Sequence, residues 1–121
     1  MTLNSFLIVF ISVTLSAFAQ LSFKYGVSSV VVPTESSLIL KAWILFTTPF
    51  VFLGLFLYGV GTVLWLFALK QIDLSLAYPF VGMSFIMVFL MGVFFLNEPF
   101  NINRLIGTLV IIVGVVLLAR S

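Results

Sequence analysis

The stretch PFVFLGLFLYGVGTVLWLFAL, residues 49–69, carries no charged side chain from end to end. A helix needs about 20 apolar residues to cross the hydrocarbon core of a bilayer. Thr48 followed by Pro49 is a helix-start signal, because proline is favoured in the first helical turn. Lys70-Gln71 ends the apolar run. We therefore predict a transmembrane helix over residues 49–69.

Similar apolar segments lie on either side of this one. Their predicted spans are 3–23, 74–96 and about 104–119. Asp73 or Ser75 can cap the span that starts at residue 74, and Asn101 or Asn103 can start the last one. With 64% hydrophobic and only 7% charged residues, the chain lacks the polar surface of a soluble domain. We expect one all-α integral membrane domain over 1–121, with four transmembrane helices.

The first span, 3–23, is expected to end at Lys24-Tyr25-Gly26, with a loop over 27–37. Its Ala17-Phe18-Ala19 also fits the cleavage pattern of a secretory signal. However, Met1–Ser5 contains no basic residue and the apolar stretch is long for a signal peptide, so we expect a retained span. Residues 37–46, with Lys41 and Trp43, are typical of a short interfacial helix.

The charge distribution leaves the membrane orientation open. The face that holds both termini would carry Lys70 and Arg120, and the opposite face Lys24, Lys41 and Arg104. The positive-inside rule needs a clear asymmetry, which is missing here. Either the chain simply has few charges, or it inserts in both orientations or pairs with an oppositely oriented relative.

Several function classes are disfavoured by composition. The chain has no Cys and no His, which removes disulfides, thiol chemistry and His-based metal sites. Five scattered basic residues form no run for nucleic acid. Glu35, Asp73 and Glu98 fall in loops or at span ends, so no carboxylate lies at mid-membrane to exchange protons. We expect no catalytic residue, metal or cofactor.

Neutral polar residues recur every four positions on the first helix, at Ser12, Ser16 and Gln20, with Lys24 one step further. Residues at this interval share one helix face. Hydrogen bonds between helices would account for such a stripe, and so would the polar wall of a substrate cavity with Lys24 at its mouth. We favour the cavity. Tyr58 and Tyr78 carry hydroxyls that need partners inside spans.

Proline and glycine mark two further features. Pro79 removes a backbone donor from the third span and Gly82 follows closely, so we expect a kink or hinge. Gly107 and Gly114 lie seven apart on the last span, as Gly54 and Gly61 do on the second. Such a stripe allows close helix approach, and for Gly107 and Gly114 both a dimer seam and an internal seam stay open. Trp65 is expected to serve in packing.

The chain as a whole resembles the small multidrug resistance-like branch of the drug/metabolite transporter (EamA-like) superfamily. The resemblance rests on the order and spacing of several short motifs. They are Ala19-Gln20-Leu21-Ser22-Phe23-Lys24, Trp65-Leu66-Phe67-Ala68-Leu69, Ser75-Leu76-Ala77-Tyr78-Pro79, Asn97-Glu98-Pro99 and the Gly107/Gly114 pair. The proton-coupled exporters of that branch carry an essential Glu where this chain has Ser16. Tyr58 and Tyr78 match the family, whereas Val81 stands where a drug-site Trp is found.

Within the branch, the pattern is similar to the aminoarabinose-phosphoundecaprenol flippase subunits. This resemblance implies transport of a polyprenyl-phosphate-linked sugar or similar amphiphile across a bacterial inner membrane. Because one four-helix chain is too small to enclose a site for such a substrate, we also expect a homodimer, or a heterodimer with a related four-helix chain, among membrane lipids. Ser16, Gln20, Tyr58 and Tyr78 would line the path, and Lys24 would meet the phosphate. The alternatives are an exporter of small cationic compounds or metabolites and a non-transporting membrane subunit.

Overall fold

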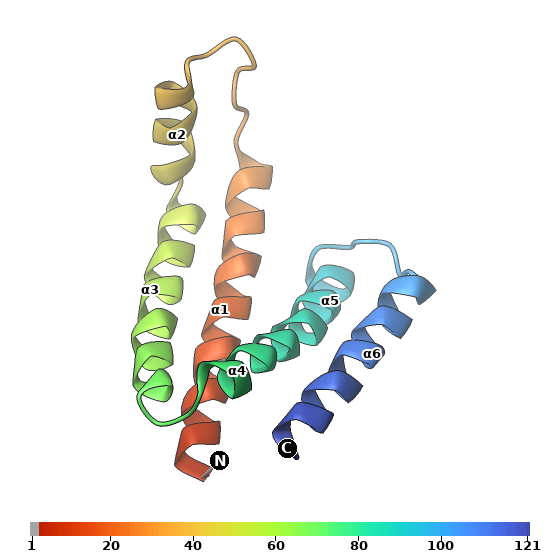
Figure 1. Ribbon diagram of the computed structural model, residues 1–121. Coiled ribbons are helices and arrows are strands. Elements are labelled where there is room, and N and C mark those ends of the chain that lie inside the picture. The colour runs from red at the N-terminus through yellow and green to blue at the C-terminus, as the bar shows by residue number, and fades with distance from the viewer. Residues whose placement is uncertain (1–2) are drawn as a thin grey trace.

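The computed structural model describes residues 3–121. Every secondary-structure element in this part of the chain is a helix (Figure 1). In chain order the elements are α1 (Leu3–Ser29), α2 (Leu38–Phe46), α3 (Pro49–Leu69), α4 (Leu74–Ala77), the 3₁₀ helix η1 (Tyr78–Gly82), α5 (Met83–Phe95) and α6 (Ile102–Ala119). Within the described residues, four segments are long and apolar enough to cross a membrane: Leu3–Ser29, Pro49–Leu69, Leu74–Phe95 and Ile102–Ala119. The expected class, an all-α multi-pass membrane protein, is confirmed.

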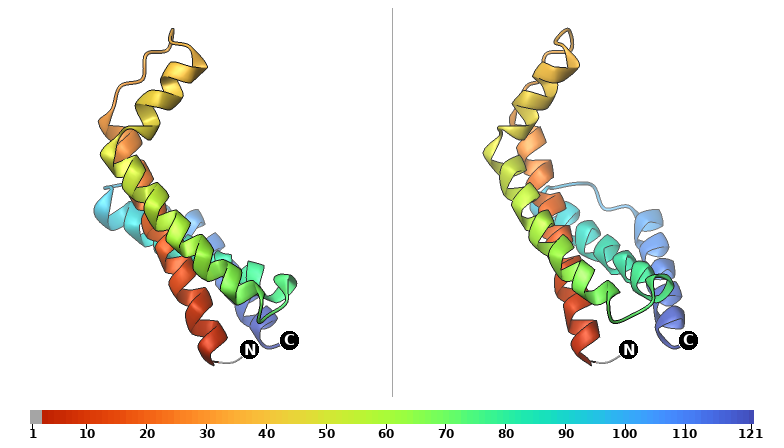
Figure 2. Two further views of the ribbon diagram at one scale, coloured as in Figure 1. Left: turned by 90° about the vertical axis from the view of Figure 1, so that its left-hand side faces the viewer. Right: turned by 60° about the vertical axis from the view of Figure 1, so that its left-hand side comes forward.

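α1 and α3 form a closely packed antiparallel pair (Figures 1 and 2). Small residues bring the two backbones together: a Cβ added at Gly61 would lie 3.2 Å from the carbonyl oxygen of Ser12. Ser12 Oγ donates to the carbonyl oxygen of Gly61 at 2.7 Å, and Ser22 Oγ donates to that of Phe50 at 2.5 Å. Close backbone approach with serine hydrogen bonds is the usual means of helix association in lipid.

The predicted end of the first helix at Lys24-Tyr25-Gly26 is wrong, because α1 continues to Ser29. Gly26 acts here as a packing residue: a Cβ on it would lie 2.6 Å from Val51 Cγ2 and 2.9 Å from the Val51 nitrogen. The first turn of α3 therefore supports the extra turns of α1. The side chain of Ser37 caps α2, which projects beyond the start of α3 as Figure 2 shows.

The third span is interrupted at its predicted hinge. Between α4 and α5 the backbone tightens into η1, which contains both Pro79 and Gly82. Proline has no N–H to donate to the α-helical pattern, and a short 3₁₀ stretch is a common response. Gly82 also allows α6 to approach, since a Cβ there would lie 2.9 Å from Ile111 Cγ2. Motion at this segment stays a prediction.

The buried core lies towards the end of the molecule that holds both termini (Figure 1). It joins α1, α3, η1 and α6 through Val9, Val13, Ala68, Phe80 and Val115. α6 begins at Ile102, where the side chain of Asn101 accepts hydrogen bonds from the N–H groups of Asn103 and Arg104. Of its residues only Thr108 and Val115 are buried, so most of this apolar helix faces outward.

Candidate substrate cavity

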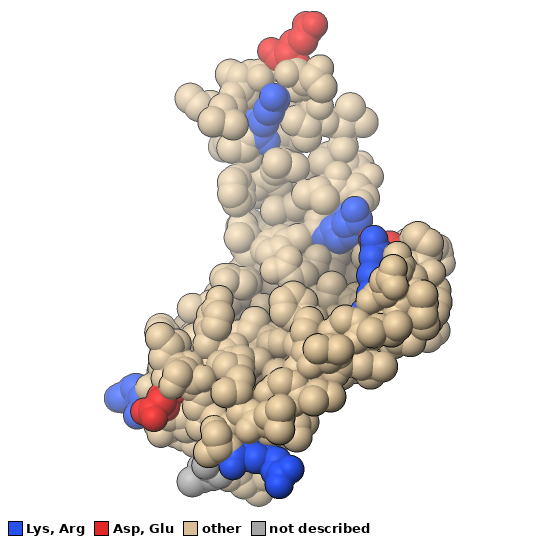
Figure 3. All heavy atoms as spheres, turned by 45° about the vertical axis from the view of Figure 1, so that its right-hand side comes forward, with Lys and Arg blue, Asp and Glu red and all other residues tan. Residues whose placement is uncertain are grey.

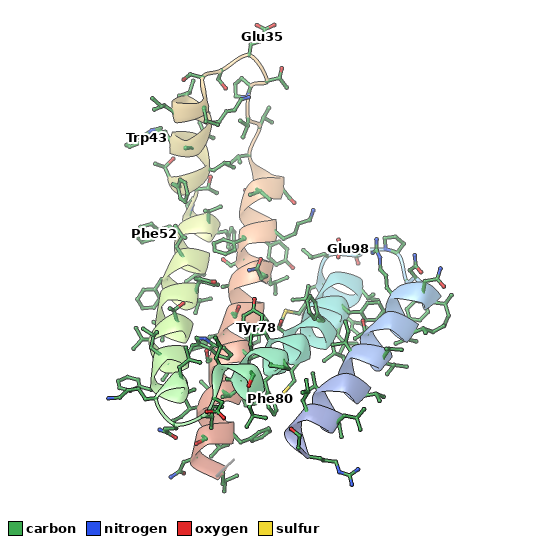
Figure 4. All side chains as sticks on the ribbon, in the orientation of Figure 1. Glu35, Trp43, Phe52, Tyr78, Phe80 and Glu98 are labelled. Atoms are coloured by element: carbon green, nitrogen blue, oxygen red, sulfur yellow. The ribbon has the colours of Figure 1, made fainter. Side chains whose placement is uncertain are left out.

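A cavity of about 230 Å³ lies between α1, α3 and the η1–α5 segment. It contains three of the residues that the sequence predicted: Ser16 from α1, Tyr58 from α3 and Tyr78 from η1. Figure 4 shows Tyr78 at the start of η1, between the α1–α3 pair and α5. The remaining lining residues are Ser12, Val13, Gly61, Thr62, Trp65, Val81 and Ser84. Among the described residues, no carboxylate and no basic side chain lines this cavity.

The hydroxyl groups around the cavity differ in whether they already have partners. Ser12 in the cavity wall, like Ser22 outside it, donates to a carbonyl oxygen of α3 and helps to hold the helix pair together. By contrast, the hydroxyls of Ser16, Tyr58 and Tyr78 make no hydrogen bond to any residue in 3–121. The polar stripe of α1 therefore contains two kinds of serine: Ser12 is hydrogen-bonded to α3, whereas the hydroxyl of Ser16 faces the cavity without a partner among residues 3–121. A hydroxyl in a membrane protein needs a partner, and these are available to a ligand or to water.

One side of the cavity adjoins the buried core. Val13 belongs both to the cavity wall and to the buried core, which also contains Phe80 and Ala68. At the same end Ser5 Oγ donates to Gln71 Oε1 at 2.7 Å, which joins the start of α1 to the turn after α3. The buried core therefore adjoins the cavity on the side of the chain termini.

The other two predicted binding residues, Gln20 and Lys24, line a second pocket rather than the same cavity. It also measures about 230 Å³ and lies between α1 and the end of α5, with Val88 and Glu98 in its wall. Gln20 follows Ser16 by one helical turn on α1, and Val88 follows Ser84 by one turn on α5. The two pockets therefore follow one another along the same pair of helices.

The far end of this second pocket is bridged by a contact that the sequence did not reveal. Tyr25 Oη donates to the carbonyl oxygen of Phe95 at 3.1 Å and joins α1 to the end of α5. The pocket with Lys24 thus lies between α1 and the end of α5.

The sequence did not predict four of the residues that line the two pockets. They are Thr62, Trp65 and Ser84 in the first pocket and Glu98 in the second. Trp65 packs against the core, as expected, but it also lines the cavity. Its place seven residues after Tyr58 puts both on one face of α3, and this spacing was a usable signal. Ser84 and Glu98 depend on the path of the chain after η1, which no local pattern encodes.

The glycines of α3 and α6 behave differently despite their identical spacing. A Cβ at Gly54 would lie 2.6 Å from Phe23 Cδ1, so this stripe is internal. A Cβ at Gly107 or Gly114 would meet no heavy atom within 4 Å. Within the part of the chain that the structure describes, an added Cβ at either glycine would meet open space, and Gly107 borders a groove between α5 and α6. Contact of this stripe with another chain stays a prediction.

Among the described lining residues of the two pockets, Glu98 is the one carboxylate. Among residues 3–121 no group of three or more Asp, Glu, His or Cys side chains lies close enough to bind one. Hydroxyls, the amide of Gln20 and the ammonium of Lys24 are groups that bind sugars and phosphates through hydrogen bonds and charge.

Comparison with known protein families assigns the chain to one of them. The model of the EamA-like transporter family matches residues 1–120. The chain belongs to the EamA-like transporter family, and so to a class of transporters rather than enzymes.

Within that class, the chain is similar to several curated proteins. Over 74 residues, 61% of this chain and 64% of the relative, it is 38% identical to the "probable 4-amino-4-deoxy-L-arabinose-phosphoundecaprenol flippase subunit ArnE" of Pseudomonas aeruginosa. It is 41% identical to the protein of the same name from Enterobacter sp., over 57% of this chain and 64% of the relative. An uncharacterized protein, y4nH, from Sinorhizobium fredii is 35% identical over 63% of the chain. The matches thus span just under two thirds of the flippase-subunit relatives. No solved structure matches.

Proposed function

We propose that this chain moves a polyprenyl-phosphate-linked sugar, or a similar amphiphile, between the leaflets of a bacterial inner membrane. The observation that carries the proposal is the cavity wall of unpartnered hydroxyls, Ser16, Tyr58 and Tyr78, without a carboxylate beside them. Neutral hydroxyls can donate and accept hydrogen bonds, which suits the many hydroxyls of a sugar. The names of the flippase-subunit relatives point to the same substrate class.

The spacing of the two pockets fits the parts of such a substrate. Ser16 and Lys24 are eight residues apart on α1, which corresponds to about 12 Å at 1.5 Å per residue. A sugar in the hydroxyl-lined cavity can therefore place its phosphate near the ammonium of Lys24, with Gln20 between them. The lipid tail leaves the pockets sideways, between α1 and α5, into the bilayer.

The transporting unit is a dimer in this proposal. α6 exposes Val110 and Leu117 along with Gly107 and Gly114, which together form an apolar stripe with gaps for an opposing helix. One four-helix chain leaves Tyr58 48% and Tyr78 64% exposed, and a partner would enclose this side of the path. The partner is either a second copy or a related four-helix chain.

Export of a small cation, the rival function, needs a carboxylate in the binding cavity, and Ser16 occupies the position where related exporters carry one. Drug-dependent proton release by the purified protein would favour that rival.

The proposal is tested by reconstituting the purified chain, alone and with a candidate partner chain, in liposomes that contain a labelled polyprenyl-phospho-sugar. We expect the label to become accessible from both leaflets. Stable insertion without leaflet exchange in either preparation would refute the transport function and leave a non-transporting subunit.

A further inference from the structure

An apolar groove of about 460 Å³ lies where α1, η1, α5 and α6 meet, at the end of the molecule that holds both termini. Phe80 and Val115 line this groove and also belong to the buried core, so its inner wall is held by the fold. On the α1 side, the ring of Phe6 stacks on that of Phe10 with centroids 6.1 Å apart. Phe6 also meets Phe80 edge-on at 6.3 Å. These ring contacts fix the shape of the wall before anything fills the groove.

Arg120 is the one charged residue among the described residues that line this groove. It follows the last turn of α6 and forms no ion pair with any residue in 3–121. Arg104 stands 16 residues earlier, at the other end of α6, which corresponds to about 24 Å along a helix. Arg120 therefore lies near one edge of the hydrocarbon core when α6 spans it. Figure 3 shows the α5–α6 side of the molecule with basic side chains at its two ends and an uncharged surface between them.

The groove is separate from the two sites that the proposed function uses. Ile112, Val115 and Ala119 share the face of α6 that borders it. The apolar stripe proposed as the dimer seam, from Gly107 to Leu117, is centred about 150° around the helix from that face. A partner on the stripe would therefore leave the groove to the bilayer.

The pocket with Lys24 is also distant. Phe10 lines the groove and Lys24 lines that pocket, and 14 residues of α1 between them correspond to about 21 Å. A substrate with its phosphate at Lys24 cannot place the same phosphate at Arg120. An occupant with an anion at Arg120 is therefore a different molecule.

We infer that this groove binds one acyl chain of an anionic bilayer phospholipid, with the head-group phosphate at Arg120. An apolar cavity stays dry, so hydrocarbon is the material that fills it. A concave wall contacts a chain on several sides, and these contacts add up where a convex surface offers few. The guanidinium of Arg120 can bind a phosphate through two parallel hydrogen bonds. Because choline neutralises the phosphate of phosphatidylcholine, Arg120 favours phosphatidylglycerol, which keeps its negative charge.

The head-group assignment is tested by native mass spectrometry of the purified full-length chain in neutral detergent. The probes are phosphatidylglycerol and phosphatidylcholine with the same acyl chains. One phosphatidylglycerol should bind per chain about fivefold more tightly than phosphatidylcholine, the effect of one exposed charge pair, and Arg120→Gln should remove this preference. Lys70→Gln is the matched control and should keep it, because Lys70 precedes the Gln71 that binds Ser5 at the same end of the molecule but lies outside the groove.

The acyl-chain assignment is tested by filling the groove. Val116 lines it and is 50% exposed, whereas Val113 lies outside it and is 59% exposed. Val116→Phe should weaken binding of both lipids about tenfold, the effect of displacing about two buried methylenes. Val113→Phe is the matched control and should bind both lipids as the wild type does.

Equal binding of the two lipids by the wild type would overturn the inference, and so would unchanged lipid binding by Val116→Phe. A loss of preference in Lys70→Gln equal to that in Arg120→Gln would show a general attraction of anions to this end of the molecule and overturn the site. Weaker pairing of Val116→Phe chains with unchanged lipid binding would assign the groove to a second copy instead. Leaflet exchange of the substrate is measured separately and tests the proposed function alone.

Discussion

Adding one methyl group to each of four glycines tests which helix faces are internal. Gly54 and Gly61 on α3 have the same spacing as Gly107 and Gly114 on α6. At Gly54 the new Cβ would lie 2.6 Å from Phe23 Cδ1 and 3.0 Å from the carbonyl oxygen of Ala19. At Gly61 the nearest atom would be 3.2 Å away, and at the α6 pair no heavy atom lies within 4 Å.

These distances set the expected sizes of the effects. Overpacking a close interface costs about 1–3 kcal/mol, so Gly54→Ala should fall in that range and Gly61→Ala near its lower end. Gly107→Ala and Gly114→Ala should change the free energy of unfolding of one chain by less than about 0.5 kcal/mol, as exposed substitutions do. Unfolding by SDS in mixed micelles, followed by Trp fluorescence, measures all four variants.

A second measurement on the same α6 positions addresses the dimer. Gly107→Leu and Gly114→Leu fill the gaps of the exposed stripe, and we expect each to weaken dimerisation about tenfold, or about 1.4 kcal/mol. Single-molecule counting of labelled chains in bilayers at increasing protein density measures this. Two results would refute the reasoning: an α6 alanine variant that unfolds as readily as Gly54→Ala, or leucine variants that pair as the wild type does.

Some hydroxyls of the cavity have a hydrogen-bond partner in the protein and others have none, and this difference gives further predictions. Ser12→Ala should cost about 0.6–1 kcal/mol of stability through loss of the hydrogen bond to α3, whereas Ser16→Ala should leave SDS unfolding unchanged; equal losses would contradict the division between structural and open serines. Tyr58→Phe and Tyr78→Phe should also fold normally but slow transport about fivefold, the effect of one lost substrate hydrogen bond, and reduced stability in either would show a structural hydroxyl instead. Asn101→Ala should cost about 1 kcal/mol because the N-terminal turn of α6 loses its cap, and an unchanged unfolding curve would rule out that role.

The spans could be predicted from sequence because lipid imposes a simple requirement, a run of about 20 apolar residues without charge. Residues 49–69 meet it without ambiguity, and α3 has the same limits. The end of α1 could not be predicted in this way. Gly26 has the local signature of a helix end, but the neighbouring Val51 turns it into a packing position.

The candidate site was predictable to the extent that it lies on regular helices. Ser16, Gln20 and Lys24 share a face of α1, and this follows from helical spacing alone. Their division between two pockets depends on where α5 crosses α1, which is set by η1. Glu98 was judged a span-end residue because its place in the wall of the pocket with Lys24 depends on the left-handed Asn97, which reverses the chain after α5.

The most direct test of the central claim compares leaflet exchange by the wild type with that of a filled-cavity variant. Ser16→Phe occupies the space between Tyr58 and Tyr78 without touching Lys24, and Val60→Phe, on an exposed part of α3, is the matched control. In proteoliposomes with a labelled polyprenyl-phospho-sugar, with the partner chain present if exchange requires it, the account predicts exchange by the wild type and Val60→Phe and little by Ser16→Phe. Equal exchange by all three chains would contradict it, because the substrate would then not pass through this cavity.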